Sequence, residues 1–441
     1  MKPNLFIRRI VATAPAEWLG HETGVSIRNH PSPSISFHEP ENGGEESPPS
    51  PRPSPPGRGR SCARVLAKCT QAAVTVLFFL AISTLTQPAQ AQRMGPRPEV
   101  VPALGAGRVV DTNAMWQIYD EVKTPFKYGV VLKGAATTEL VDCPSIFRDG
   151  EHWYMMYVAI SNKVGYQTFL ARSDDLLHWD KMGSVLSFNG PGHWDAWQAD
   201  GGIALADYHW DGPHTLETFD GRYWLSYIGG AIQGYETDPL SIGLAWTRTA
   251  AWPREWIRLV ENPVLAPKQP DARGFEAKTL YKSQIIHDEG RSLGWPFVMF
   301  YNGKYKNGFE QIGMAVSCDM RHWSRYGTNA VIVNGEEKAN GISGDPQIVK
   351  IGDVWVMFYF GAGWQPKAFD TFAASYDLAN WTKWTGPHLV EPSEPYDKTY
   401  AHKPWVLKWN GVVYHFYCAV GTEGRVLALA TSKDLKTPNF K

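Results

Sequence analysis

Carboxylate residues stand at the expected starts of strand segments that lie far apart in the sequence. Four of five such starts open with Asp or Glu: Asp142-Cys-Pro-Ser-Ile, Asp200-Gly-Gly-Ile, Glu276-Ala-Lys-Thr-Leu, Asp345-Pro-Gln-Ile and, without a carboxylate, His402-Lys-Pro-Trp-Val. Carboxyl groups that share a pocket shift one another's pKa, so one can stay protonated beside ionised neighbours. Glycosidic bond cleavage needs this pairing, because an acid protonates the leaving oxygen while a carboxylate works on the opposite face.

Each of these carboxylates also has a purely structural interpretation. Asp142 and Asp345 could cap turns through side-chain hydrogen bonds, and Asp200 precedes a Gly-Gly pair that is typical of a turn. Glu276 has fewer structural reasons to open a strand. Three further Asp residues recur within a fixed turn motif and are interpreted as structural: Asp175, Asp319 and Asp377.

Aromatic and basic residues near these starts could bind a sugar. Tryptophan rings stack on sugar faces, although they also pack between strands. Arginine and lysine could bind hydroxyl groups or a substrate carboxylate, and histidine a hydroxyl group or a metal ion. The candidate substrate-binding residues are Trp194, Trp197, Arg273, Asp345, Trp364, His402 and Lys403. No metal ligand is assigned firmly.

The elements that would position these residues recur five times. An aromatic strand ends in Tyr157, Tyr227, Tyr301, Tyr359 and Tyr417, and a small-x-hydroxyl triplet follows at Ala171, Ala245, Ala315, Ala373 and Ala430. A Gly lies six or seven residues before each Tyr, where a hairpin turn is needed. Each unit thus predicts four antiparallel strands, and five units predict an all-β, five-bladed β-propeller. An irregular β-sandwich is the alternative. In a propeller the innermost strands converge on a central channel, whose mouth is the usual ligand site.

The N-terminal part differs in composition from the repeats. Residues 1–60 form a Pro/Ser/Arg-rich extension that we expect to be disordered, or to precede the true start near Val65. Residues 61–91 have the layout of a signal peptide with an apolar run at 72–83, and a membrane anchor is the alternative. A linker at 92–111 then leads to the propeller at 112–441. We therefore expect a secreted or periplasmic protein.

Composition excludes several classes of function. The 441 residues contain 43 Lys and Arg against 44 Asp and Glu, a balance that argues against a nucleic-acid partner or a polybasic membrane surface. The 19 Trp, 19 Tyr and 19 Phe with 41 Gly and 32 Pro favour short strands over a helical bundle. Five Cys, two of them in the signal segment, allow at most one disulfide in the mature chain.

The five repeats, the Asp-x-Pro and Asp-Pro openings, the Glu-Ala opening and the Ser-x-Asp-Leu-x-x-Trp turns resemble the five-bladed glycoside hydrolases over about residues 112–441. These include family 43, the arabinanase and β-xylosidase family, and family 32, the invertase family. The resemblance implies that Asp142 is the base or nucleophile, that Asp200 tunes the site, and that Glu276 is the general acid. It also implies that a structural calcium ion can occupy the channel, with His402 as a candidate ligand, although no cofactor is required.

Two departures from the family pattern bear on these assignments. Cys143 separates Asp142 from the proline, and a one-residue slip reverses a side chain unless a bulge re-aims it. Lys278 replaces the proline that follows Glu-Ala in the family. Alternatively, Lys282-Ser-Gln-Ile aligns with Asp345-Pro-Gln-Ile, which leaves Glu276 upstream in a loop.

The sequence therefore predicts a monomeric, secreted glycoside hydrolase that acts on plant or algal poly- or oligosaccharides and has no stable membrane association after signal cleavage. Inversion is predicted, with Asp142 as the base and Asp345 as its alternate, because the invertase-type Asn-Asp-Pro motif is missing. The alternatives are a non-catalytic carbohydrate-binding propeller and a glycoside phosphorylase. A phosphorylase needs a basic cluster, for which Arg273, Lys278 and Lys403 are the candidates.

Overall fold

The computed structural model describes residues 100–436, apart from 102, 104, 137, 250, 251, 253, 254 and 334–338. They belong to one compact unit, Ala89–Lys441. The extension expected at 1–60 and the signal peptide expected at 61–91 lie outside the described residues, as does the first part of the expected linker. Within the described part, no helix has both the length and the apolar character needed to cross a membrane.

The regular structure is almost entirely antiparallel β-sheet, arranged as five four-stranded meanders. Meander 1 contains β3 (Leu140–Asp149), β4 (His152–Ile160), β5 (Tyr166–Ser173) and β6 (Asp180–Leu186). Meander 2 contains β7 (Gln198–Ile203), β8 (Tyr223–Gly230), β9 (Ser241–Thr247) and β10 (Ile257–Arg258). Meander 3 contains β11 (Thr279–His287), β12 (Phe297–Lys304), β13 (Glu310–Ser317) and β14 (Ser324–Tyr326).

Meander 4 contains β15 (Ile342–Ile351), β16 (Val354–Ala362), β17 (Phe369–Ser375) and β18 (Thr382–Lys383). Meander 5 contains β19 (Tyr400–Trp409), β20 (Val412–Gly421), β21 (Gly424–Thr431) and, from the N-terminal side, β2 (Phe126–Leu132). The remaining elements are β1 (Val100–Val101), α1 (Thr112–Val122) and the 3-10 turns η1 (Gly274–Glu276) and η2 (Pro395–Asp397). Meanders 3 and 4 are joined into one sheet by the pair Glu310 and Ile342.

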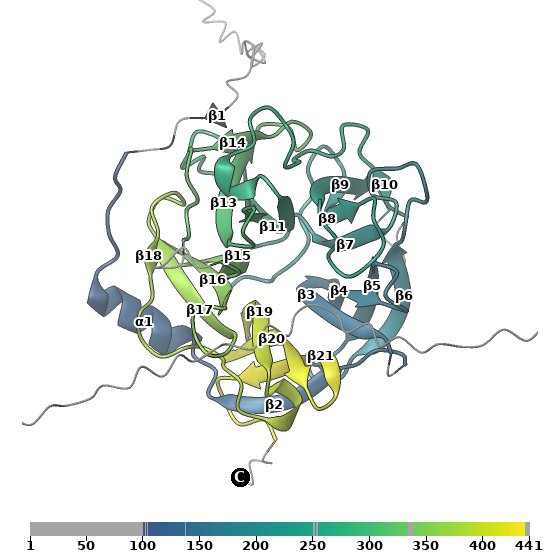
Figure 1. Cartoon of the computed structure of the whole chain (residues 1–441). Coiled ribbons are helices and arrows are strands. Elements are labelled where there is room, and N and C mark those ends of the chain that lie inside the picture. The colour runs from purple at the N-terminus through teal and green to yellow at the C-terminus, as the bar shows by residue number, and fades with distance from the viewer. Residues whose placement is uncertain are drawn as a thin grey trace, which may run out of the picture. The chain divides into compact units, whose positions relative to one another are not determined.

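The meanders contact one another in cyclic order. The second strand of each touches the first strand of the next, through β4 and β7, β8 and β11, β12 and β15, β16 and β19, and β20 and β3. Figure 1 shows the sheets placed around a common centre, with β2 beside β21. The first strands of all five meanders therefore face the centre.

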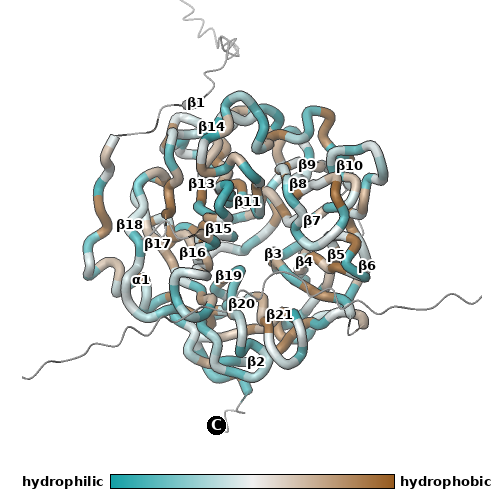
Figure 2. Tube along the Cα trace, viewed as in Figure 1, coloured by the Kyte–Doolittle hydropathy of each residue, from teal (hydrophilic) through white to brown (hydrophobic). Residues whose placement is uncertain are grey.

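The hydrophobic core lies between neighbouring meanders. One buried cluster joins Phe300 of β12 to Met357 of β16, and another joins Tyr157 of β4 to Phe416 of β20. The other three interfaces have similar clusters. Figure 2 shows apolar residues along strands such as β13 and β16.

The recurring Asp residues form outer turns, as the sequence predicts. Ser173 Oγ accepts a hydrogen bond from Leu176 N at 2.9 Å, while Asp175 Oδ1 accepts from His178 N at 2.8 Å. Trp179 Nε1 donates to Leu176 O, which fixes the indole over the turn. Ser317, Asp319 and Trp323 repeat these bonds. In the third turn Asp377 and Trp381 repeat theirs, while Ser375 Oγ accepts a hydrogen bond from Asp377 N. These Asp residues are structural.

The first strands of meanders 1, 4 and 5 each carry a β-bulge next to a proline. The ladder shifts between Asp142 and Ser145 in β3, and at the matching places in β15 and β19. Cys143, Asp345 and Lys403 have positive φ there, at 51°, 51° and 63°. A bulge bends the strand and re-aims the side chain, and proline fits because no ladder hydrogen bond is lost.

Candidate active site

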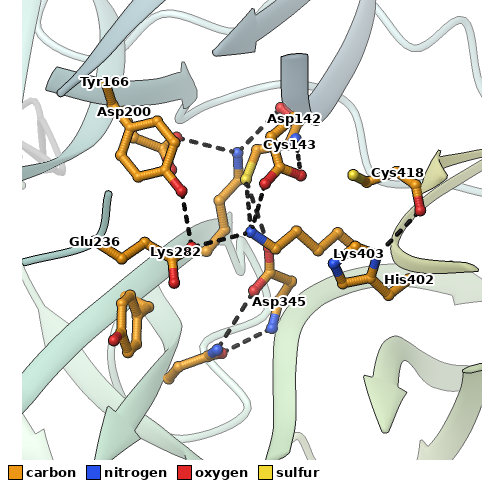
Figure 3. A network of polar contacts seen from close by, with 12 residues as sticks. Asp142, Cys143, Tyr166, Asp200, Glu236, Lys282, Asp345, His402, Lys403 and Cys418 are labelled. Atoms are coloured by element: carbon orange, nitrogen blue, oxygen red, sulfur yellow. Dashed lines mark hydrogen bonds and ion pairs between the residues drawn. The ribbon is translucent and has the colours of Figure 1, made fainter. Parts of the chain in front are cut away.

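The pairing of the first and second strands aligns the five meanders with one another. In each meander, the residue before the recurring Tyr of the second strand pairs with one residue of the first strand. These first-strand residues are Ser145, Gly202, Gln284, Gln347 and Trp405. Two positions earlier in each strand stand Cys143, Asp200, Lys282, Asp345 and Lys403, which we call the axial cluster. Figure 3 shows these side chains converging. The register therefore matches Lys282-Ser-Gln-Ile with Asp345-Pro-Gln-Ile, and Glu276 lies upstream in η1.

Asp142 is the residue before Cys143 of the axial cluster, and its carboxylate forms ion pairs with two cations. Its Oδ2 lies 2.9 Å from Lys403 Nζ and 2.6 Å from Arg425 Nη1, and its Oδ1 accepts a hydrogen bond from Cys143 N. Burial opposes ionisation, but the charges of Lys403 and Arg425 hold the pKa of Asp142 well below its usual range. Asp142 is thus an ionised, buried carboxylate with both oxygens occupied.

The two carboxyl groups of the axial cluster, Asp200 and Asp345, are less well compensated by cations than Asp142 is. Asp200 Oδ1 lies 3.7 Å from Lys282 Nζ, and burial raises the pKa of Asp200 despite that charge. Asp345 N donates to Asn302 Oδ1 at 2.8 Å, and the thiol of Cys143 lies 3.8 Å from Asp345 Oδ2. Burial raises the pKa of Asp345 to about 6 although both lysines oppose the shift.

Glu236 and Glu310 also belong to this region, and the sequence reasoning missed both. Glu236 lies in the connection from β8 to β9, accepts a hydrogen bond from Tyr166 Oη at 2.8 Å and lies 3.3 Å from Lys403 Nζ. Its side chain is 27% exposed, so solvent reaches it. A signal was available: the connection from Tyr227 to its triplet is longer than in the other units.

Glu310 is the first residue of β13 and has an uncommon electrostatic environment. Lys304 Nζ lies 3.5 Å from its Oε1. Burial raises the pKa of Glu310 to about 8, because Lys304 compensates only partly and the charge of Glu236 raises it further. Glu310 is therefore protonated at neutral pH. The sequence signal would have been a Glu that opens a strand whose central residues are apolar.

Glu276 is not brought together with Asp142 and Asp200. It is fully buried and forms ion pairs with Arg273 and Arg325, and Tyr301 Oη donates to its Oε2 at 2.6 Å. Burial opposes ionisation, but the two arginines keep the pKa of Glu276 below its usual value. The same acid, tyrosine and cation arrangement recurs as Asp195, Tyr227 and Arg258, and as Asp397, Tyr417 and Lys127. Such repetition marks a structural element of the meander.

The remaining predicted residues fall into different surroundings. Trp194 packs on Tyr227 with a ring separation of 5.6 Å, and Trp197 lies 5.7 Å from Phe188. Trp364 Nε1 donates to Ile342 O. Arg273 forms an ion pair with Glu276, whereas Lys403 belongs to the axial cluster.

His402 is the last of the predicted residues and lies beside the axial cluster. Burial, followed by the charge of Arg425, lowers the pKa of His402 to about 3, so the ring is neutral. His402 Nδ1 lies 3.0 Å from Cys418 O.

Comparison with known proteins places this arrangement in context. No family model matches the chain. Two solved structures, one of BT0996 in a complex with RGII and one described as a glycoside hydrolase, are each 44% identical over 75% of this chain and 98% of theirs, with TM-scores of 0.71 and 0.69. A thermostable family-43 glycoside hydrolase, 13% identical, covers 69% of this chain and 91% of its own with a TM-score of 0.50, which shows a shared fold.

One curated relative matches part of the sequence. The 1,2-beta-oligomannan phosphorylase of Thermoanaerobacter sp. (strain X514) is 29% identical over 146 residues, which are 31% of this chain. The match spans 46% of that protein, or about half its length.

Proposed function

The chain belongs to the propeller-fold glycoside hydrolase superfamily, and from this premise we propose that it cleaves glycosidic bonds with Glu310 as general acid and Glu236 as the partner carboxylate. We further propose that the five meanders are five blades of one propeller. The cyclic order of their contacts and the pairing of β2 with β21, which would close the ring, support this architecture.

The observation that carries the proposal is the opposite electrostatic environment of the two glutamates. Glu310 is buried with a pKa of about 8. Glu236 is partly exposed, accepts a hydrogen bond from Tyr166 Oη and forms an ion pair with Lys403 Nζ. A glycosidase needs a protonated acid for the leaving oxygen and a second carboxyl group for the opposite face. The burial of Glu310 suits the first role, and the exposure and polar contacts of Glu236 suit the second.

In the proposed reaction Glu310 Oε donates its proton to the leaving oxygen as the glycosidic bond breaks. Glu236 then either removes a proton from an attacking water or attacks the anomeric carbon itself. Asp142 takes no direct part, because its oxygens are bound to Lys403, Arg425 and a backbone amide. It positions Lys403, which in turn holds Glu236. Asp200 and Asp345 contribute to the electrostatic potential around Lys282 and Lys403.

Inversion stays our prediction for the stereochemical outcome. Inverting enzymes leave room for a water molecule between the carboxyl groups, whereas retaining enzymes do not. Proton NMR of the first-formed anomer decides between them. A product with the configuration of the substrate would contradict inversion and make Glu236 a nucleophile.

Phosphorolysis is the second candidate, because the curated relative is a phosphorylase. Against it, the basic residues proposed for phosphate are already paired: Arg273 with Glu276, Lys278 with Asp238 at 3.0 Å, and Lys403 with Asp142. A panel of aryl and natural glycosides with and without phosphate separates the alternatives. Turnover without phosphate supports hydrolysis, a phosphate requirement with release of sugar phosphate supports phosphorolysis, and binding without turnover supports a carbohydrate-binding module.

We also propose that the substrate is a poly- or oligosaccharide of the kind that the RGII complex of the 44%-identical structure exemplifies.

Export follows from the proposed signal peptide at 61–91. N-terminal sequencing of the protein recovered outside the cell tests it, with a start near residue 92 expected. We expect a monomer that needs no cofactor.

A further inference from the structure

A channel calcium ion is what the resemblance to arabinanase-like enzymes implies, with His402 as its candidate ligand. Calcium takes six to eight oxygen ligands at 2.3–2.6 Å. The neutral His402 offers one nitrogen to Cys418 O, and the other lies 3.5 Å from Arg425 Nη1. Among the described residues no three His, Cys, Asp or Glu side chains are gathered as a metal site. The residues present do not fit the ion.

Lysine side chains stand where such an ion would have to lie. Lys403 Nζ is 2.9 Å from Asp142 Oδ2, 3.3 Å from Glu236 Oε1 and 3.6 Å from Cys143 Sγ. Lys282 Nζ reaches across the same centre, 3.7 Å from Asp200 Oδ1 and 3.4 Å from Cys143 O. The two lysines come from β11 and β19, so they enter from different meanders (Figure 3).

We propose that the ammonium groups of Lys282 and Lys403 are the permanent cations of the channel, so that its carboxylates are paired with cations of the chain itself and bind no divalent cation. Bulged strand geometry makes this possible, because Lys403 adopts the positive φ that turns its side chain inward. The proposal goes beyond the proposed reaction and does not depend on it.

The pairing of buried charges gives the physical reason. Three cations, Lys282, Lys403 and Arg425, lie among four carboxyl groups in a largely buried region, those of Asp142, Asp200, Asp345 and Glu236. Buried charges are tolerated only when paired, and removing one partner leaves an uncompensated charge. A divalent cation added here would face three fixed positive groups. Removing one ammonium would instead leave carboxylates in need of a cation.

The first test uses the full-length protein as purified. We expect the melting temperature (Tm) to be the same in excess EDTA and in 10 mM CaCl2, and metal analysis to find no stoichiometric calcium. A fall of Tm in EDTA, or one calcium ion per chain, would overturn the proposal. This measurement needs no substrate, so a failure of the proposed hydrolase activity leaves its outcome unchanged.

The second test removes one resident cation. In Lys403→Ala, Asp142 and Glu236 lose their shared ammonium group and a space opens between them. We expect a lower Tm in EDTA than wild type, and recovery of about 2–4 °C when calcium is added. If added calcium leaves the Tm of Lys403→Ala unchanged, the assignment of Lys403 as the channel cation is overturned.

Lys127→Ala is the matched control. Lys127 Nζ pairs with the buried Asp397 at 2.5 Å, away from the axial cluster. Its removal should also lower Tm, but calcium should restore nothing, because Lys127 forms its direct ion pair with one carboxylate, whereas Lys403 joins two. Recovery of both variants by calcium would show a general salt effect and would overturn the proposal.

Discussion

Buried carboxyl groups in this protein differ chiefly in the cations that reach them. Asp142 contacts two cations within 3 Å and stays ionised, whereas Glu310 has Lys304 at 3.5 Å and stays protonated at neutral pH. Burial disfavours the charged form of both, so the neighbouring charge decides the outcome. The same side-chain chemistry thus gives a fixed anion at one place and a proton donor at the other.

The pH dependence of activity follows from the protonated state of Glu310. With a pKa of about 8, the group is a competent acid below that pH and loses its proton above it. We expect kcat/KM to fall as pH rises through about 8, and Glu310→Gln to abolish this alkaline limb. The loss in kcat should be about 10²–10⁴-fold on substrates with poor leaving groups. A mutant that keeps the limb would remove Glu310 from the acid role.

Glu310 also makes a prediction for stability. Its pKa in the folded protein, about 8, lies above its ordinary value of 4.5, so the folded state binds the proton more tightly than the unfolded chain. Stability linked to this group is therefore fully present below about pH 4.5 and is lost as pH rises towards 8. Glu310→Gln should have a higher Tm than wild type at pH 8.5, with the difference shrinking towards pH 4.5. Calorimetry at both pH values measures it, and an equal difference at both would contradict the linkage.

At the scale of elements, the acid, tyrosine and cation arrangement stabilises each meander that carries it. Glu276→Gln would leave Arg273 without its buried counter-charge and Arg325 with Asp271 as its remaining carboxylate partner. We expect a loss of roughly 3–5 kcal/mol in the free energy of unfolding, with kcat of the folded fraction unchanged. Urea unfolding and activity below the transition measure both quantities. The exposed pair of Asp120 with Lys123 supplies the control, since Asp120→Asn should cost less than about 0.5 kcal/mol. A large loss of kcat with intact stability would return Glu276 to the chemistry.

Repeated elements were predictable because their sequence signals are local. The Ser-x-Asp turns, the aromatic second strands and the alternative alignment of Lys282-Ser-Gln-Ile could all be derived from spacing, and the ladders agree with them. The sequence analysis required a bulge before Pro144 if the direction of the Asp142 side chain was to change, and the bulge is present. It places Cys143, rather than Asp142, at the axial position.

The glutamates of the proposed reaction were not predictable in this way. Glu236 lies in a connection without a repeat partner, and its importance arises from Lys403 and Tyr166, which are distant in sequence. The pKa of Glu310 depends on burial that only tertiary packing creates. The recurrence of the arrangement around Glu276 was not visible in the sequence either, because its tyrosine and cation partners come from different strands.

At the scale of the whole molecule, the insertion of residues 204–219 after β7 links several meanders. Arg148 N of β3 donates to His214 O, and Lys350 N of β15 donates to Tyr208 O. His214 Nε2 lies 2.9 Å from Lys408 O of β19. These partners stand at the far ends of the first strands, about 16 Å from the axial position at roughly 3.3 Å per residue. The insertion therefore crosses the end of the molecule opposite the candidate site.

Trp210 anchors this insertion, and its replacement separates stability from activity. The indole is 1% exposed, packs near Phe358 and donates through Nε1 to Glu121 of α1 at 2.8 Å. Trp210→Ala removes these contacts and should lower the free energy of unfolding by roughly 3–5 kcal/mol. Because Glu236 and Glu310 stand at the other end of the strands, kcat/KM measured well below the transition should stay within about twofold of wild type. Denaturant unfolding and initial rates on one sample provide the comparison. A parallel collapse of kcat/KM in fully folded Trp210→Ala would show that the insertion sets the geometry of the distant site, and the assignment of separate ends would have to be abandoned.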